Sequence, residues 1–295
     1  MDSSAFSDLE VMTESTMEWL SNFALDLGLT RFPEHLNTFL SSLFFFLAIH
    51  QAFAPLISTW LSCSFRKMNR RARNNWSIHV VSQVHALIIV PLSLRALNSP
   101  ALDKDRVSGW DDDKSGLLQA IASAYFVWDT IDAIINYTDF GFIVHGLACS
   151  LIYLLSFKPF LSYYAARCLL WESSTIFLNI HWFLDKTDRT GSTFQLINGI
   201  LLLVTFFGMR LVYGAYVVSV SLVLSYNFFF TLYDVRDKVS PVYLLIYGVG
   251  NIVLQGLNVY WFMKMISALQ KRFSPNSSVD RKATQVNRKL DAKKE

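Results

Sequence analysis

Acidic, amide and imidazole side chains recur at helical spacing inside otherwise apolar segments of this 295-residue chain. The segment 116–137 holds four polar residues at spacing i, i+4, i+7 and i+11: Tyr125, Asp129, Asp132 and Asn136. This spacing places them on one face of a helix. Carboxylates in a membrane segment are costly unless they face protein or water. Two interpretations stay open: buried acids neutralised by a neighbouring cation, or one polar wall of a cavity.

Similar polar stripes follow the other apolar segments. They comprise Trp76, His79 and Gln83; His145 and Cys149; Glu172, Thr175, Asn179 and Trp182; Asn198, Thr205 and the nearby Arg210; and Asn251, Gln255, Asn258 and Phe262. Ordinary helix packing needs only one or two such stripes, because interhelical hydrogen bonds in membranes average well under ~2 kcal/mol. Five or six converging stripes favour a shared polar interior or a cavity for a lipid headgroup. We predict that it is lined by Trp76, His79, Gln83, Tyr125, Asp129, Asp132, His145, Glu172, Asn179, Asn198, Arg210, Asn251 and Gln255.

His145 is the candidate for acid–base chemistry, because an imidazole oriented by an acid suits proton transfer near neutral pH. Glu172 is its candidate partner, and an aspartate of the segment 116–137 could take the same role through space. A single histidine within a span is more often a hydrogen-bonded core residue, so no catalytic residue is assigned. His35 and His50, near the first apolar segment, are interpreted as structural.

Motifs for metals, cofactors and nucleic acids are missing from the sequence. No histidine pair has zinc spacing, and there is no Walker loop, nucleophile elbow or G-x-G-x-x-G. We therefore expect neither a metal site nor a cofactor. Cys63, Cys149 and Cys168 are interpreted as small buried hydrophobes. The basic stretches lack interleaved aromatic residues, which argues against nucleic-acid binding.

The segments that position these residues read as membrane-spanning helices. The chain is 53% apolar and only 17% charged, with a mean hydropathy of +0.33, which is too apolar for a soluble domain of this length. We predict an all-α polytopic membrane protein with about seven spans at 36–60, 76–97, 116–137, 140–157, 160–184, 194–230 and 240–270. The sixth is too long for one straight helix, and Gly208, Arg210 and Gly214 indicate a break, a kink or a re-entrant piece within it.

The charge of the connecting segments predicts the topology. Segment 61–75 carries five basic residues and no acid, and residues 271–295 carry eight basic residues against three acids. The first 35 residues instead carry seven acids against one arginine. Because basic segments stay in the cytosol, the C-terminus is predicted to be cytosolic and the N-terminus luminal. This arrangement needs an odd number of spans, which seven satisfies.

The spans divide the chain into four parts. Residues 1–35 form an acidic luminal segment in which Met17, Leu20, Phe23, Ala24 and Leu27 recur at helical spacing, typical of an interfacial helix or of a packing lid. Residues 36–60 form the first transmembrane helix. Residues 65–273 form the main domain, and 274–295 form a basic, disordered cytosolic tail.

Five stretches in order resemble the TLC-domain family, which includes ceramide synthases and translocating-chain-associated membrane proteins. They are Trp76 with SIHVVSQVHA (77–86), SAYFVWDT (123–130), FIVHG (142–146), WESSTIFLN (171–179) and NGILLLVTFFGMR (198–210). The resemblance covers roughly 65–273. It implies six helices bundled around a central cavity, preceded here by one extra span. It also implies residence in the endoplasmic reticulum or a related endomembrane.

One departure from ceramide synthases bears on function. Those enzymes have a paired histidine where this chain has His145–Gly146, and an acidic pair where it has Glu172. The chain is more similar to the non-synthase branch, associated with lipid homeostasis. Our first hypothesis is a protein that binds, senses or transports a lipid in its cavity. The alternatives are an acyltransferase or related lipid enzyme using His145, and a structural or chaperone-like membrane factor. The expected partners are membrane lipids, with a homo-oligomer or other membrane proteins as further options.

Overall fold

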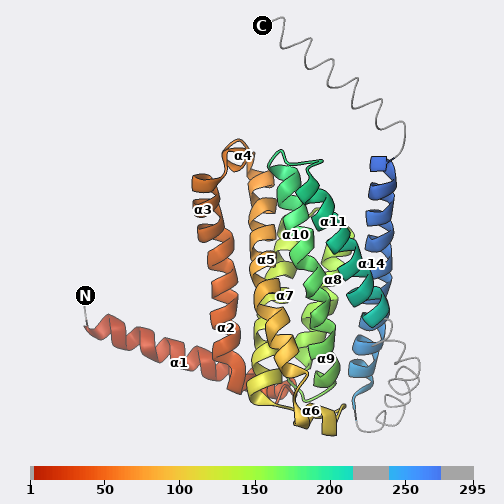
Figure 1. Ribbon diagram of the computed structural model, residues 1–295. Coiled ribbons are helices and arrows are strands. Elements are labelled where there is room, and N and C mark those ends of the chain that lie inside the picture. The colour runs from red at the N-terminus through yellow and green to blue at the C-terminus, as the bar shows by residue number, and fades with distance from the viewer. Residues whose placement is uncertain (1–2, 215–238, 274–295) are drawn as a thin grey trace, which may run out of the picture.

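The structure, a computed structural model, describes residues 3–214 and 239–273, and every regular element in these two ranges is helical (Figure 1). The elements before the first long loop are α1 (Ser3–Asp26), α2 (Phe32–Ala48), η1 (Ile49–Phe53), α3 (Ala54–Leu61), α4 (Cys63–Arg66) and α5 (Arg70–Ala96). Then come α6 (Pro100–Lys104), η2 (Asp112–Gly116), α7 (Leu117–Ile135), α8 (Phe140–Leu155), α9 (Ser162–Cys168), η3 (Leu169–Glu172), α10 (Ser173–Lys186), α11 (Thr193–Phe206), η4 (Phe207–Tyr213) and α14 (Pro241–Phe273).

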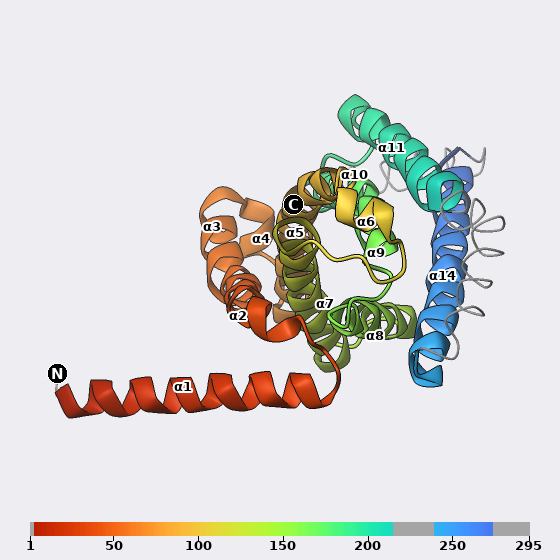
Figure 2. The same cartoon turned by 90° about the horizontal axis from the view of Figure 1, so that it is seen from below.

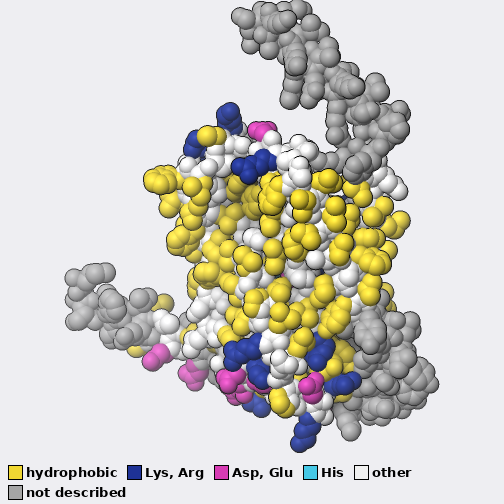
Figure 3. All heavy atoms as spheres, in the orientation of Figure 1, with side chains coloured by type: hydrophobic (Ala, Val, Ile, Leu, Met, Phe, Trp, Pro, Cys, Tyr) yellow, Lys and Arg dark blue, Asp and Glu magenta, His cyan; other side chains and the backbone are white. Residues whose placement is uncertain are grey.

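Five of the described helices are long and apolar enough to cross a membrane: Phe32–Leu61, Arg70–Ala96, Asp112–Ile135, Thr193–Tyr213 and Pro241–Gln270. A shorter apolar helix, Phe140–Leu155, accompanies them. The predicted span at 160–184 consists of three shorter pieces, α9, η3 and α10. Figure 3 shows a wide apolar belt between two ends that carry the charged side chains. The predicted all-α, multi-pass membrane fold is therefore confirmed.

The sixth predicted span does not continue as a regular α-helix. Where the sequence indicates a break, the structure has the π-helix η4, Phe207–Tyr213, with Arg210 buried at its centre. A π-turn inserts an extra residue and changes the direction of the side chains, and such turns are frequent at functional sites. The rest of this predicted span, 215–230, and the tail 274–295 lie outside the described residues.

Helix α7 lies in the middle of the bundle, against α2, α5 and α8 (Figure 2). Small side chains at Ala120, Ala122 and Ala124 are fully or almost fully buried and let neighbouring helices approach closely. On α8, Gly146 makes the closest approach: a Cβ there would lie 2.6 Å from Thr130 Oγ1 on α7. Gly146 thus faces a helix contact and not the interior space described below.

Helix α1 runs away from the bundle, roughly across the direction of the spans (Figures 1 and 2). Its second half packs through Met17, Leu20 and Ala24 against the start of α2. Trp19 and Phe23 stack on each other at 5.6 Å and stay largely exposed, at 63% and 51%. The predicted helix exists in this position, and its placement at a membrane interface stays a prediction.

Candidate functional site

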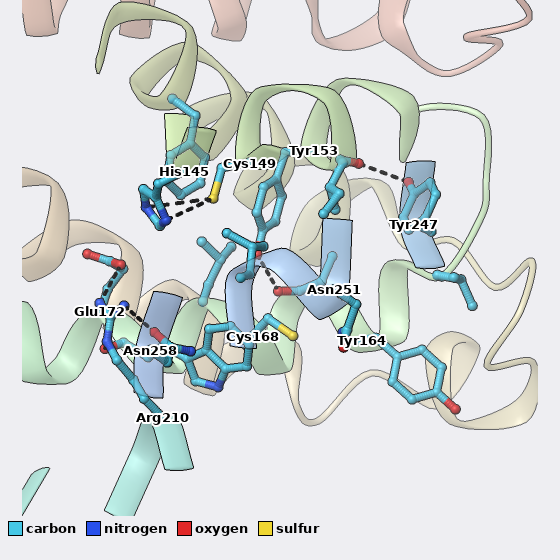
Figure 4. Close-up of a pocket in the computed structure, with 17 residues that line it drawn as sticks. His145, Cys149, Tyr153, Tyr164, Cys168, Glu172, Arg210, Tyr247, Asn251 and Asn258 are labelled. Atoms are coloured by element: carbon cyan, nitrogen blue, oxygen red, sulfur yellow. Dashed lines mark hydrogen bonds and ion pairs between the residues drawn. The ribbon is translucent and has the colours of Figure 1, made fainter. Parts of the chain in front are cut away.

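Two neighbouring cavities lie inside the helical bundle. The larger, called the upper cavity, has a volume of about 350 Å³ and is lined by α5, α7, α8, α10, η4 and α14. The smaller, called the lower cavity, has a volume of about 70 Å³ and is lined mainly by α8, α9, η3 and α14 (Figure 4). Both are bordered by Phe126, His145, Glu172 and Arg210, so these four residues separate the two spaces.

The structure brings most of the predicted cavity residues together. Those at the upper cavity are His79, Tyr125, Asp129, Asp132, His145, Glu172, Asn179 and Arg210. Asn251 lines the lower cavity. The remaining four, Trp76, Gln83, Asn198 and Gln255, line neither of them. The stripe on α7 faces the cavity along its whole length, because Asn136 also lies there.

Two of the four predicted residues outside the cavities bond neighbouring helices instead. Trp76 Nε1 donates to Ser58 Oγ at 2.8 Å, and Asn198 Nδ2 donates to the carbonyl of Phe177 at 2.8 Å. On α5 the cavity face is formed by Asn75, His79 and Ser82, so the true face is rotated from the predicted stripe. Gln83 on α5 and Gln255 on α14 each bury a side-chain atom that has no hydrogen-bond partner among the described residues.

Arg210 is the centre of a buried polar network at the boundary of the cavities (Figure 4). Its Nη2 bonds Glu172 Oε1 and Thr175 Oγ1, each at 3.1 Å. Nε donates to the Trp171 carbonyl and to Ser174 Oγ, and Nη1 donates to Asn258 Oδ1 at 3.2 Å. The network ties η3 and α10 to η4 and α14. A buried guanidinium with a carboxylate partner and these further acceptors is well compensated in a membrane interior.

The two carboxylates of α7 have different surroundings. Asp132 accepts a hydrogen bond from Asn136 Nδ2 at 2.9 Å and lies 3.7 Å from His50 Nε2 and 3.5 Å from Asn74 Nδ2. Asp132 therefore has neighbouring polar partners, as in the first interpretation, although none of the three is a lysine or an arginine. His50, read from the sequence as structural, supplies one of them from the π-helix η1, Ile49–Phe53. No sequence signal links two residues so far apart along the chain.

Asp129 lines the upper cavity without such partners. Across residues 3–214 and 239–273, no side chain makes a hydrogen bond or an ion pair with its carboxylate. Its position matches the second interpretation, a polar group facing a cavity. The sequence places Asp129 and Asp132 on the same helical face, and this spacing does not predict which of the two carboxylates has a partner.

A second polar contact fixes the wall formed by α5 and α10. His79 Nδ1 lies 2.8 Å from Asn179 Oδ1, and Asn179 Nδ2 donates to Ser82 Oγ at 3.1 Å. The His79 ring also stacks on Trp182, with ring centroids 4.0 Å apart. These contacts hold two lining residues in fixed orientations.

His145 faces both cavities, and its ring lies 3.8 Å from Cys149 Sγ, one turn along α8 (Figure 4). Within the described part of the chain, no hydrogen bond joins it to Asp129, Asp132 or Glu172. Glu172 is instead bound by Arg210. His145 and Glu172 therefore border the same two cavities but do not form an oriented acid–base pair. Cys149 is buried, as expected, and also lines the lower cavity, whereas the same prediction is wrong for Cys63, which is exposed.

Several lining residues were not part of the predicted set. Asn258, which belongs to the polar stripe of the last span at i+7 from Asn251, lines the lower cavity. Trp261 lines the upper cavity at i+10, where an extended helical count would have found it. Lys264 lies one turn further and pairs with Asp139 at 3.6 Å. Asn75 lies one residue from the predicted stripe of α5.

One group outside the cavities combines metal-ligating residue types: Glu34, His35 and Asp112, whose ligand atoms lie within 4.8 Å of one another. These atoms already have protein partners. Arg31 pairs with Glu34 at 3.4 Å, and His35 Nε2 lies 3.3 Å from Asp112 Oδ1. The contacts account for the group without an ion.

Comparison with known proteins agrees with this architecture. The family model of the TLC domain matches residues 75–267. An uncharacterized TLC domain-containing protein of Schizosaccharomyces pombe is 36% identical over 261 residues, which cover 86% of this chain and 86% of the relative. TLC domain-containing protein 4 of Homo sapiens is 28% identical over 247 residues, 80% of this chain and 90% of the relative.

A second yeast relative gives the same picture. An uncharacterized TLC domain-containing protein of Saccharomyces cerevisiae is 30% identical over 232 residues, 74% of this chain and 70% of the relative. No solved structure matches significantly. The family match spans both cavities, including every lining residue from Asn75 to Met265. On this evidence the chain belongs to the TLC-domain family.

Proposed function

We propose that this multi-pass TLC-domain protein binds, senses or transports a membrane lipid in its upper cavity and so affects lipid homeostasis. The observation that carries the proposal is the convergence of polar side chains from α5, α7, α8, α10 and η4 on one cavity of about 350 Å³. A headgroup there finds polar partners, while its chains contact apolar lining residues such as Leu178 and Phe206.

The proposal includes the location. Charge at the helix ends favours an endomembrane orientation with a cytosolic C-terminus and a luminal N-terminus. In this orientation the upper cavity lies nearer the cytosolic end. Asn75, which borders it, belongs to the basic segment 61–75, and Arg71 of that segment donates to the carbonyl of Tyr137, next to the lining residue Thr138. Residence in the endoplasmic reticulum or a related compartment is the expectation.

Filling the cavity tests the proposal. Ala133 lines the upper cavity, so Ala133→Trp occupies the space without removing a polar group. The matched control is Ile134→Trp on the next residue, which is 54% exposed on the outer face of α7. Each protein is purified in detergent, and the retained lipids are extracted and identified by mass spectrometry.

We expect the wild-type protein and Ile134→Trp to retain a defined lipid, and Ala133→Trp to lose most of it. Wild-type protein that retains no lipid above a detergent blank would overturn the proposal, as would equal retention by Ala133→Trp. The structural or chaperone hypothesis predicts polar groups sealed between helices, and the open carboxylate of Asp129 does not fit it.

A lipid-modifying enzyme is the second candidate, favoured by one observation: the His145 ring borders both cavities. An imidazole there would meet a lipid carbonyl and could transfer a proton. His145→Ala separates the two functions. Retained lipid with unchanged cellular lipid turnover supports binding, whereas loss of one acylated product supports the enzyme.

A further inference from the structure

The charged side chains of the upper cavity are unevenly matched. They are Asp129, Asp132, Glu172, Arg210 and Lys264. Arg210 pairs with Glu172 at 3.1 Å, and Lys264 pairs with Asp139 at 3.6 Å. Asp132 lies within reach of His50 and is hydrogen-bonded by Asn136. After these pairings, the carboxylate of Asp129 is left without a partner among the residues that the structure describes.

The unpaired carboxylate of Asp129 favours a cationic headgroup over an anionic one. Each lysine or arginine that lines the cavity already has an acidic partner, so an anionic headgroup finds no free cation in the described part of the wall. An ammonium group, in contrast, finds a carboxylate whose charge is otherwise uncompensated. Because the site lies within a membrane protein, where screening by water is weak, such a pairing is stronger than at a surface.

Aromatic rings surround the same space. The lining includes Tyr125, Phe126, Phe142, Phe206 and Trp261. Tyr125 precedes Asp129 by one helical turn, and Phe142 stacks against Trp261 with ring centroids 5.9 Å apart. Aromatic faces attract ammonium groups, and cages of such rings bind quaternary ammonium ligands. A carboxylate together with several rings is therefore suited to a cationic headgroup.

We propose that the upper cavity is specific for lipids that carry an ammonium headgroup, with Asp129 as the counter-ion and the aromatic lining as the surrounding wall. The inference rests on the lipid-binding function proposed above and specifies its ligand. A primary ammonium donates hydrogen bonds to the Asp129 carboxylate, whereas a choline group contacts the carboxylate electrostatically and the rings through its methyl groups. Phosphatidylethanolamine, phosphatidylcholine and single-chain amines share the ammonium group. The two phospholipids also carry a phosphate, for which the described wall offers no unpaired lysine or arginine.

A competition experiment tests the specificity. The full chain, purified in detergent, is equilibrated with equal amounts of phosphatidylethanolamine, phosphatidylcholine, phosphatidylglycerol and diacylglycerol of matched acyl chains. A parallel arm adds hexadecylamine, which separates a phospholipid from a single-chain amine. The protein is repurified, and each retained lipid is quantified relative to the micelle. We expect the ammonium lipids to be enriched about tenfold over phosphatidylglycerol and diacylglycerol.

Asp129→Asn isolates the charge, because the amide has nearly the same size and still forms hydrogen bonds. We expect this variant to retain lipid but to lose the preference. Asp113→Asn, which alters an exposed carboxylate on η2, serves as the control and should keep it. An unchanged preference in folded Asp129→Asn would overturn the inference.

If Asp129→Asn does not fold, the lipid competition with the wild-type protein alone still tests the inference. Retention of lipid without any preference for ammonium headgroups would refute the inference and leave the proposed function intact. Retention of no lipid would refute both. Enrichment of one ammonium class over the other two identifies the natural source of the headgroup and supports the inference.

Discussion

Arg210→Met is the substitution with the largest expected effect on stability. It removes the guanidinium that bonds Glu172, Thr175, Ser174, Asn258 and the Trp171 carbonyl, and it leaves Glu172 as an uncompensated buried charge. Breaking one side of a buried ion pair costs about 3–5 kcal/mol. For a chain of this size each kcal/mol shifts the melting temperature by about 2–4 °C, so the expected loss is about 6–20 °C.

The pairing itself is measured by a double-mutant cycle. Glu172→Leu should cost less than Arg210→Met, because Arg210 keeps its hydrogen bonds to Thr175, Ser174 and Asn258. The double variant Arg210→Met with Glu172→Leu removes both charges at once. It should therefore be more stable than the sum of the two single losses predicts, by about 1–3 kcal/mol.

The assay is thermal unfolding of the purified protein in one detergent, followed by intrinsic tryptophan fluorescence. Arg31→Met is the control, because Arg31 pairs with Glu34 at 3.4 Å while both side chains are largely exposed. An exposed pair contributes at most about 1 kcal/mol. If Arg210→Met melts within about 2 °C of the wild type, or if the cycle is additive, the Arg210 network does not hold the bundle together.

Three further predictions use the same material. Gly146→Ala should lower the free energy of unfolding by about 1–3 kcal/mol, because the added Cβ meets α7. Its control is Gly248→Ala, which has open space at its Cβ and should be neutral or stabilising, so the opposite order would refute this packing. His79→Ala should cost about 1–3 kcal/mol, since it removes the bond to Asn179 and the stack on Trp182, and unchanged melting would contradict those contacts. In cells whose plasma membrane alone is permeabilised, an antibody should reach a C-terminal tag but not an N-terminal one; the reverse accessibility would invert the topology.

Helices and spans were predictable because a bilayer imposes a local requirement, about 20 apolar residues in a row. Loop charge predicts an orientation in the same local way, and that orientation stays a prediction. The departures from regular helix were not fully predictable. The glycines near Arg210 indicated a break. The π-helix at Phe207–Tyr213, however, carries the Arg210 guanidinium whose acceptors lie on other helices, and the local sequence does not specify those acceptors. The π-helix at Ile49–Phe53 had no local signal.

The candidate site was predictable to within the orientation of each helix. Periodicity placed the α7 stripe correctly at the cavity, but on α5 it selected Trp76 and Gln83 where the structure uses Asn75 and Ser82. A polar side chain on a span either bonds a neighbouring helix or lines a cavity, and spacing along one helix does not distinguish these two roles. Trp76, bonded to Ser58, is the first kind.

The polar interior therefore contains both partnered side chains and an unpartnered one, and the polar stripes of the sequence do not distinguish them. Arg210 and Glu172 form an ion pair that joins separate helices, and Asp132 and His50, 3.7 Å apart, form a second contact between helices. Asp129 has no such partner among the described residues, so no ion pair or hydrogen bond of its carboxylate joins helices. Substitutions within the pairs should thus change stability first and lipid binding second. A substitution at Asp129 should change lipid choice with little loss of stability, so the two measurements assign each residue to framework or ligand contact.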